Sequence, residues 1–221
     1  MRDEDFEVFI DEFGEATHRF EVPASSIEKW RDKLPDQLLT YWKNEGWCGY
    51  ANGLFWTVDP DEYEDLIDEW LEDTKLEEID SFHVIARSAF GDLYACGENT
   101  GRSVTIACPL NNIIAFKNKL KPKPKDDLDL SIRAFFSLSE PKDFDLKDEN
   151  SQPLFKRASE KLGQLAPDEM YGFEPALVLG GKIRLENLFK VKTDVHLTIL
   201  RQLASPALPF SNVDIDNLLN P

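Results

Sequence analysis

The stretch from Leu34 to Val58 is the part of the sequence that most restricts how the chain can fold. Pro35 suits the first position of a helix, and the apolar residues after it recur at helical spacing until Gly46 ends the pattern. The dipeptide Asn52-Gly53 then favours a tight type I′ hairpin turn, which requires positive φ at both central residues. Four aromatic residues surround this turn: Trp47, Tyr50, Phe55 and Trp56. A short helix that runs into an aromatic hairpin predicts the nucleus of an α+β core.

Three further strand-like runs follow the hairpin, at Phe82–Ala89, Leu93–Cys96 and Ser103–Ala107. Short turns that contain glycine separate these runs, which is typical of neighbouring antiparallel strands. We therefore predict an α+β fold in which N-terminal helices pack on an antiparallel meander sheet. A smaller mixed α/β domain follows it toward the C-terminus.

Composition predicts where the chain divides. The run 117–125, KNKLKPKPK, has no apolar period and is interpreted as a linker between a first domain at 1–116 and a second at 126–205. A basic nucleic-acid-binding patch is the alternative for this run, but no aromatic residue is interleaved with its lysines. Residues 206–221 are predicted to form a loosely attached tail. Within the second domain, the apolar pattern predicts helices at 128–136, 151–162 and 194–203 and a strand at 185–191.

The net charge of the chain is strongly negative. It has 42 acidic and 25 basic side chains, which gives −17 at pH 7. Such a charge repels nucleic acids and anionic membranes and favours a basic partner, although acidity that serves solubility alone is the alternative. No apolar run approaches the roughly 18 residues that a membrane span needs. The acidic start, MRDEDFEVF, does not resemble a secretory signal, so we expect a cytoplasmic protein.

The negative charge is concentrated between Asp59 and Asp80, where 12 carboxylates accompany one lysine. Asp59-Pro60 is a typical helix start, and apolar residues then recur at spacings of three and four. Like charges at these spacings destabilise a helix, so folding does not account for the pattern. A solvated face is one interpretation, and a partner-facing surface is the other. The outward-facing candidates for partner binding are Asp61, Glu64, Asp65, Asp68, Glu69 and Glu72.

The sequence contains no recognised catalytic motif of the HExxH, GxSxG or DFG type. His83, Cys96 and Cys108 do not have the spacing of a zinc motif, and core packing is the more common role of such residues. The acidic run after Asp59 lacks the glycine that a calcium loop carries at its sixth position. We therefore predict no catalytic residues, no metal and no cofactor, and keep a small hydrolase or nucleotide-binding enzyme as an alternative class.

Two long stretches resemble a known family. PDQLLTYWKNEGWCGYANGLFWTVDPDEY, together with HVIARSAFGDLYACGENTG from His83, resembles the GAD-like domain of bacterial immunity proteins. The stretch from Leu154 to Leu203, LFKRASEKLGQLAPDEMYGFEPALVLGGKIRLENLFKVKTDVHLTILRQL, is similar to the C-terminal domain of type VI secretion DNase-immunity proteins. The two stretches lie in the order that the family requires and cover most of the chain.

The resemblance implies an immunity protein, not an enzyme, whose partner is a cognate nuclease toxin with a basic DNA-binding surface. We expect it to cover that surface or the active site sterically, without direct contact to nucleic acid or membrane. A general acidic module for some other basic cytosolic partner is the alternative. Besides the acidic helix, we predict contacts from a turn in the second domain, with Tyr63 and the apolar members of that turn as exposed anchors. The turn residues are Asp168, Glu169, Met170, Tyr171, Phe173 and Glu174.

Overall fold

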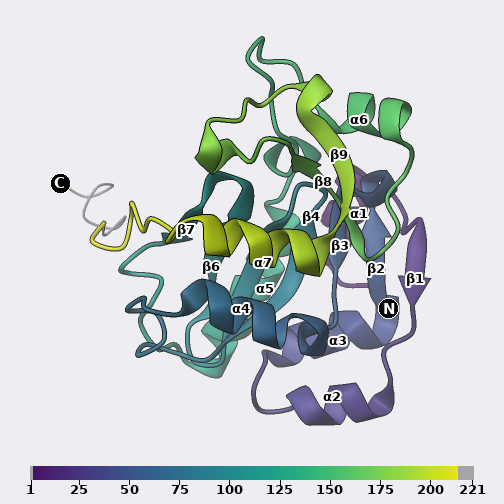
Figure 1. Cartoon of the computed structure of the whole chain (residues 1–221). Coiled ribbons are helices and arrows are strands. Elements are labelled where there is room, and N and C mark those ends of the chain that lie inside the picture. The colour runs from purple at the N-terminus through teal and green to yellow at the C-terminus, as the bar shows by residue number, and fades with distance from the viewer. Residues whose placement is uncertain (1, 214–221) are drawn as a thin grey trace, which may run out of the picture.

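The computed structural model describes residues 2–213 and has one large antiparallel sheet (Figure 1). In these residues the seven strands of this sheet lie side by side in chain order, so the predicted meander is confirmed. They are β1 (His18–Phe20), β2 (Trp47–Tyr50), β3 (Phe55–Thr57), β4 (Phe82–Ser88), β5 (Asp92–Gly97), β6 (Gly101–Ala107) and β7 (Asn112–Ala115). A second, two-stranded sheet pairs β8 (Glu169–Phe173) with β9 (Leu188–Lys192).

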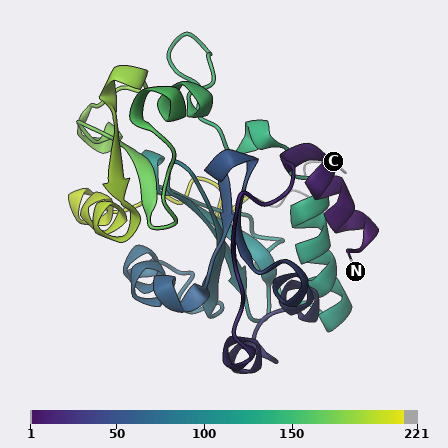
Figure 2. The ribbon, with the colours of Figure 1, turned by 90° about the vertical axis from the view of Figure 1, so that its right-hand side faces the viewer.

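Helices cover both faces of the large sheet, as Figure 2 shows with the sheet seen on edge. On one face, α1 and α5 pack against each other, and α5 lies over β6. On the other face, α4 packs on β4 and α7 packs on α4. The helices are α1 (Glu4–Phe13), α2 (Ala24–Trp30), α3 (Asp36–Glu45), α4 (Glu64–Leu71), α5 (Lys125–Ser137), α6 (Phe155–Leu162) and α7 (Thr193–Leu203). The predicted α+β class is therefore confirmed.

Aromatic rings fill the core between the sheet and α1. The ring centre of Phe9 in α1 lies 5.0 Å from that of Tyr50 and 5.5 Å from that of Phe55, and both of these residues belong to the predicted hairpin. Phe136 of α5 closes the same cluster at 5.1 Å from Phe9. Edge-to-face contacts at these distances add to the free energy that burial supplies. The hairpin is therefore the point where the N-terminal helix and α5 meet.

The hairpin turn differs from the two-residue type I′ turn predicted for it. Tyr50 pairs with Phe55, so four residues connect β2 and β3, and the first three have positive φ. The indole Nε1 of Trp56 donates to the carbonyl of Gly53 at 2.8 Å. The indole ring also lies 3.2 Å from the position that a Cβ of Gly53 would take. The four-residue loop therefore packs on the buried Trp56 ring.

The C-terminal residues share one hydrophobic core with the large sheet. The backbone N–H of Tyr171 in β8 donates to the carbonyl of Ala89, after β4, at 2.8 Å. Gly91 has φ of +90°, and a Cβ there would lie 2.5 Å from the Met170 side chain. Glycine at this turn therefore allows β8 to approach the sheet closely.

The segments predicted as a linker and a tail both contact the sheet. In the 117–125 run, the backbone N–H of Lys123 donates to the carbonyl of Asn99 at 2.9 Å. Ala207 forms a parallel bridge with Asn112 at the β7 edge. The part of the tail at 214–221 lies outside the described residues. Among residues 2–213, no helix combines the length and apolar character that a membrane crossing requires.

Candidate protein-binding site

Helix α4 has one apolar face and one acidic face. The Asp59 side chain accepts a hydrogen bond from the backbone N–H of Asp61 at 3.1 Å, and Pro60 follows it. This cap starts the one-turn helix η2 (Pro60–Tyr63), which continues into α4 as predicted. The buried side chains of α4 are Leu66, Ile67, Trp70 and Leu71. Packing of this face on β4 leaves the carboxylates of α4 facing outward or toward α7.

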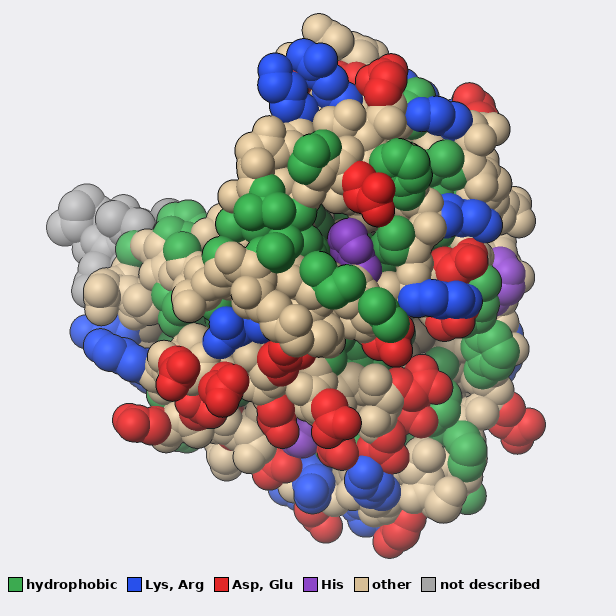
Figure 3. Space-filling model, viewed as in Figure 1, with side chains coloured by type: hydrophobic (Ala, Val, Ile, Leu, Met, Phe, Trp, Pro, Cys, Tyr) green, Lys and Arg blue, Asp and Glu red, His purple; other side chains and the backbone are tan. Residues whose placement is uncertain are grey.

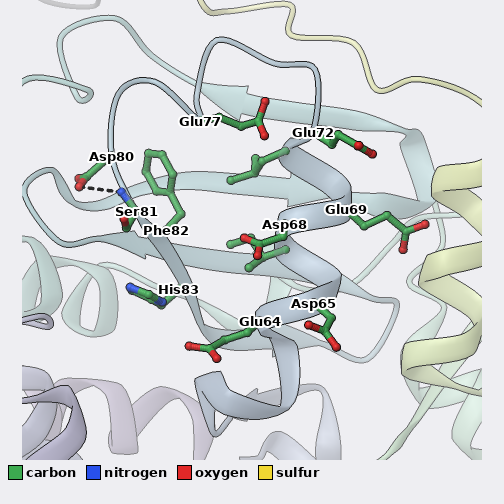
Figure 4. Close-up of a pocket in the computed structure, with 12 residues that line it drawn as sticks. Glu64, Asp65, Asp68, Glu69, Glu72, Glu77, Asp80, Ser81, Phe82 and His83 are labelled. Atoms are coloured by element: carbon green, nitrogen blue, oxygen red, sulfur yellow. Dashed lines mark hydrogen bonds between the residues drawn. The ribbon is translucent and has the colours of Figure 1, made fainter.

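An acidic groove of about 800 Å³ lies between α4 and the segment that leads into β4. His83 lies in the wall of the groove opposite α4. Figure 4 shows Glu64 and Asp68 on the side of α4 that faces this wall. Asp65 and Glu69 lie on the other side of α4, toward α7. The lining residues are Glu64, Asp65, Ile67, Asp68, Glu69, Leu71, Glu72, Glu77, Asp80, Ser81, Phe82 and His83. The hollow thus extends over the exposed surface of α4 to both of its sides. Five of the six predicted acidic residues line it, and Asp61, in η2, does not.

Among the described residues, basic side chains form ion pairs with this row of carboxylates at its N-terminal end alone. Lys29 of α2 lies 2.6 Å from the Asp61 carboxylate and 3.8 Å from that of Glu64. In the described part of the chain, no Lys or Arg side chain comes within 4.0 Å of the carboxylates of four acidic residues: Asp65, Asp68, Glu69 and Glu72. Neighbouring unpaired carboxylates create a negative potential over the groove. The site is therefore suited to a cationic surface.

The remaining acidic residues of the groove stabilise loops. The Asp80 carboxylate accepts from the backbone N–H groups of Asn99 and Thr100, at 2.9 and 2.8 Å, and from the Thr100 hydroxyl at 2.8 Å. Glu77 accepts from the backbone N–H of Asp73 at 3.1 Å. Glu77 and Asp80 were not predicted to belong to the site, although both lie in the same acidic run. Their folding back over α4 is a property of the tertiary structure.

The second predicted contact segment is a buried strand, not an exposed turn. Its apolar residues Met170, Tyr171 and Phe173 lie in β8 and are buried, and Tyr63 of η2 is buried as well. The prediction of four exposed anchors was therefore wrong. The reason is that both faces of β8 are covered. Consecutive side chains of a strand point to opposite faces, and Met170 and Tyr171 are both buried.

The acidic residues of this segment are largely neutralised. Asp168 lies 2.5 Å from the Lys192 ammonium, which holds the pKa of the carboxyl below its usual value. The Glu169 carboxylate accepts from the backbone N–H of Ala166 at 2.9 Å, and this bond lowers its pKa. Glu174 is exposed. Compared with α4, β8 offers little unpaired charge to a partner.

No metal site accompanies the groove in the described residues. Between residues 2 and 213, no three His, Cys, Asp or Glu side chains are arranged to hold a metal ion. The His83 Nε2 instead lies 3.1 Å from the Glu98 carboxylate, and Cys96 and Cys108 are buried. The groove itself offers a row of carboxylates in a surface hollow.

Two family models match this chain in succession. The GAD-like domain matches residues 4–110, and the C-terminal domain of T6SS immunity protein Tdi1 matches residues 129–204. The chain joins a GAD-like domain to a Tdi1-type immunity domain. The acidic groove lies in the GAD-like domain, while α7, which borders it, lies in the Tdi1-type domain.

A solved structure supports the same fold over nearly the full length. The crystal structure of Atu4351 from Agrobacterium tumefaciens matches with a TM-score of 0.78 and 21% sequence identity. The match covers 90% of this chain and 89% of that chain. At this identity the likeness establishes the fold alone. No curated protein sequence matches the chain.

Proposed function

We propose that this protein is the cytoplasmic immunity protein of a type VI secretion DNase toxin, which it binds and inhibits sterically. The Tdi1-type domain supports the role of effector immunity protein. The acidic groove supports the nature of the partner, because a DNase must present a basic surface to the phosphates of DNA. In this proposal the protein acts by binding and not by catalysis.

The observation that carries the proposal is the set of unpaired carboxylates on α4 of an immunity-family protein. In the described residues the carboxylates of Asp65, Asp68, Glu69 and Glu72 form no ion pair, and Arg201 bonds only to the backbone carbonyls of Glu69 and Glu72, so the four negative charges are available to another molecule. Opposite charge on the toxin would steer association and exclude wrong partners more than it would add affinity. Occupation of the toxin's DNA-binding face by this helix would then exclude DNA.

The test is co-purification of the tagged protein from the producing bacterium, with identification of its partners by mass spectrometry. The eluate is assayed for DNA cleavage before and after selective denaturation of the tagged protein. We expect one stoichiometric basic partner whose nuclease activity appears only on release. Recovery of no nuclease while the secretion system is expressed would contradict the proposal. Turnover of a substrate by the purified protein alone would instead indicate an enzyme.

A further inference from the structure

Six exposed apolar side chains form a strip over α7 and the segments packed on it, on the same side of the molecule as the α4 carboxylates. Figure 3 shows hydrophobic side chains gathered over α7 and the segment above it, with carboxylates below them over α4. Leu179 is 62% exposed, Val195 57% and Ile199 47%. The members of this apolar strip are Leu110, Val178, Leu179, Val195, Ile199 and Leu203. Exposed apolar patches rimmed by charge are typical of protein interaction sites.

Helix α7 is apolar on two faces, which packing within the chain does not explain. Leu197 and Leu200 are buried in the core and hold the helix in place. Val195, Ile199 and Leu203 recur at a spacing of four, so they share a different face of the helix. A surface helix needs only one apolar face for its own core. The outer face of α7 is therefore available to a second molecule.

The strip is one rigid surface together with α4. Its other residues come from the one-turn helices η3 (Cys108–Leu110) and η5 (Leu177–Leu179), and both of these pack against α7. Arg201 of α7 donates from Nε to the carbonyl of Glu69 at 2.8 Å and from Nη2 to that of Glu72 at 3.1 Å. These bonds attach α7 to the C-terminal end of α4. The apolar and acidic surfaces thus have a fixed relative position.

We infer that the apolar strip and the α4 carboxylates form a single docking surface for the nuclease toxin, an inference that rests on the function proposed above. The matching surface of the toxin carries an apolar patch with basic residues along one side. The carboxylates accelerate association, and the strip supplies the desolvated contacts that slow dissociation. The negative charge beside the strip favours the basic toxin over a second copy of this chain. Two copies, each with a net charge of −17, would bring like charges together.

The test compares two double variants in binding to the nuclease recovered by co-purification. Val195→Asp with Ile199→Asp alters the strip. Leu130→Asp with Leu138→Asp alters two exposed leucines, one in α5 and one directly after it, on the opposite face of the sheet. We expect the strip variant to bind at least about 100-fold more weakly, through faster dissociation, while the α5 variant binds like the wild type. Thermal unfolding of both variants checks that the fold is intact.

A photo-crosslinking residue at position 199 gives a second measurement on an otherwise unchanged surface. We expect its adduct to contain the nuclease, and the same residue at position 138 to give no such adduct. If the nuclease binds both double variants equally and is crosslinked from neither position, the strip is not the docking surface, although the proposed function stands. An adduct between two copies of this chain would also overturn the inference. If no nuclease binds even the wild type, the proposed function fails and this inference fails with it.

Discussion

Asp92 is a largely buried carboxyl at the turn between β4 and β5. Its carboxylate accepts from the Ser88 hydroxyl at 3.0 Å, and that hydroxyl in turn accepts from the backbone N–H groups of Phe90 and Asp92. Burial raises the pKa of Asp92 to about 6. The folded chain therefore binds this proton more tightly than the unfolded chain, where the pKa is about 3.9.

The sign of this shift predicts how stability depends on pH. The contribution of Asp92 to stability is fully present below about pH 4 and is lost as the pH rises to about 6. Asp92→Asn removes the ionisation. We therefore expect the unfolding free energy of this variant, relative to that of the wild type, to increase by about 2 kcal/mol between pH 4 and pH 7. Urea unfolding of both proteins across this range measures the difference. A difference that stays constant with pH would contradict the assignment.

Arg87 is a fully buried cation without a carboxylate partner in the described residues. Its guanidinium donates from Nη2 to the carbonyl of Pro167 at 2.6 Å and lies 5.1 Å from the centre of the Trp56 ring. Burial lowers the pKa of this guanidinium. Pro167 belongs to the segment before β8, so this single side chain bonds the large sheet to the C-terminal domain.

We predict that Arg87→Ala lowers the free energy of unfolding by about 3 kcal/mol, because it leaves a cavity and a buried carbonyl without its donor. Arg31→Ala is the matched control, since the side chain of Arg31 is 56% exposed. The control is expected to change stability by less than about 0.5 kcal/mol. Denaturant unfolding compares the two, and equal stabilities would refute a linking role for Arg87.

At the scale of the element, α4 carries negative charge where it opposes helix stability. Asp68 and Glu69 lie in its C-terminal half, next to the negative end of the helix dipole, and its last turn has no basic residue. Asp65→Lys, Asp68→Lys and Glu69→Lys together are therefore expected to raise stability by about 0.5 kcal/mol, because the gain at Asp68 and Glu69 exceeds the loss at Asp65, which lies in the first turn. The same change should slow association with the toxin and reduce the salt dependence of that rate.

The two opposite effects separate a functional charge from a solvated face. Association kinetics at low and high salt measure the effect on binding, and thermal unfolding measures the effect on stability. Glu4→Lys, Asp11→Lys and Glu12→Lys on α1 form a control with the same change in net charge on the other face of the sheet. If the α4 and α1 variants associate equally fast at low salt, only net charge matters and α4 is not a contact helix.

At the scale of the molecule, the GAD-like and Tdi1-type domains are predicted to unfold as one cooperative unit. The hydrogen bonds from Tyr171 to Ala89 and from Arg201 to α4 join them, and the buried core is continuous across them. All five tryptophans lie before residue 71, so their fluorescence reports on the GAD-like domain. Far-UV circular dichroism reports on all helices. We expect coincident transitions by both probes in urea. An earlier change in circular dichroism would instead show that the C-terminal domain unfolds separately.

Local spacing and turn residues were enough to predict α4 and the meander strands β4 to β6, but not β8, which was predicted as a turn. The apolar stripe of α4, its Asp59-Pro60 start and the glycine turns between strands all predicted what the structure contains. The acidic surface could also be predicted from the sequence. Carboxylates at these spacings repel one another and destabilise a helix, so helix stability does not explain them.

Burial of individual side chains could not be predicted, because it depends on contacts between elements that are distant in sequence. Met170, Tyr171 and Phe173 were expected to be exposed anchors, yet β8 is covered on both faces. The exposed apolar residues are instead on α7, where a helix with two apolar faces gives no local sign of which face enters the core. Contacts between residues distant in sequence, such as those of Arg201 with α4, select that face. Burial is a property of the packed chain, and for this reason the apolar strip beside the acidic groove could not be found from the sequence.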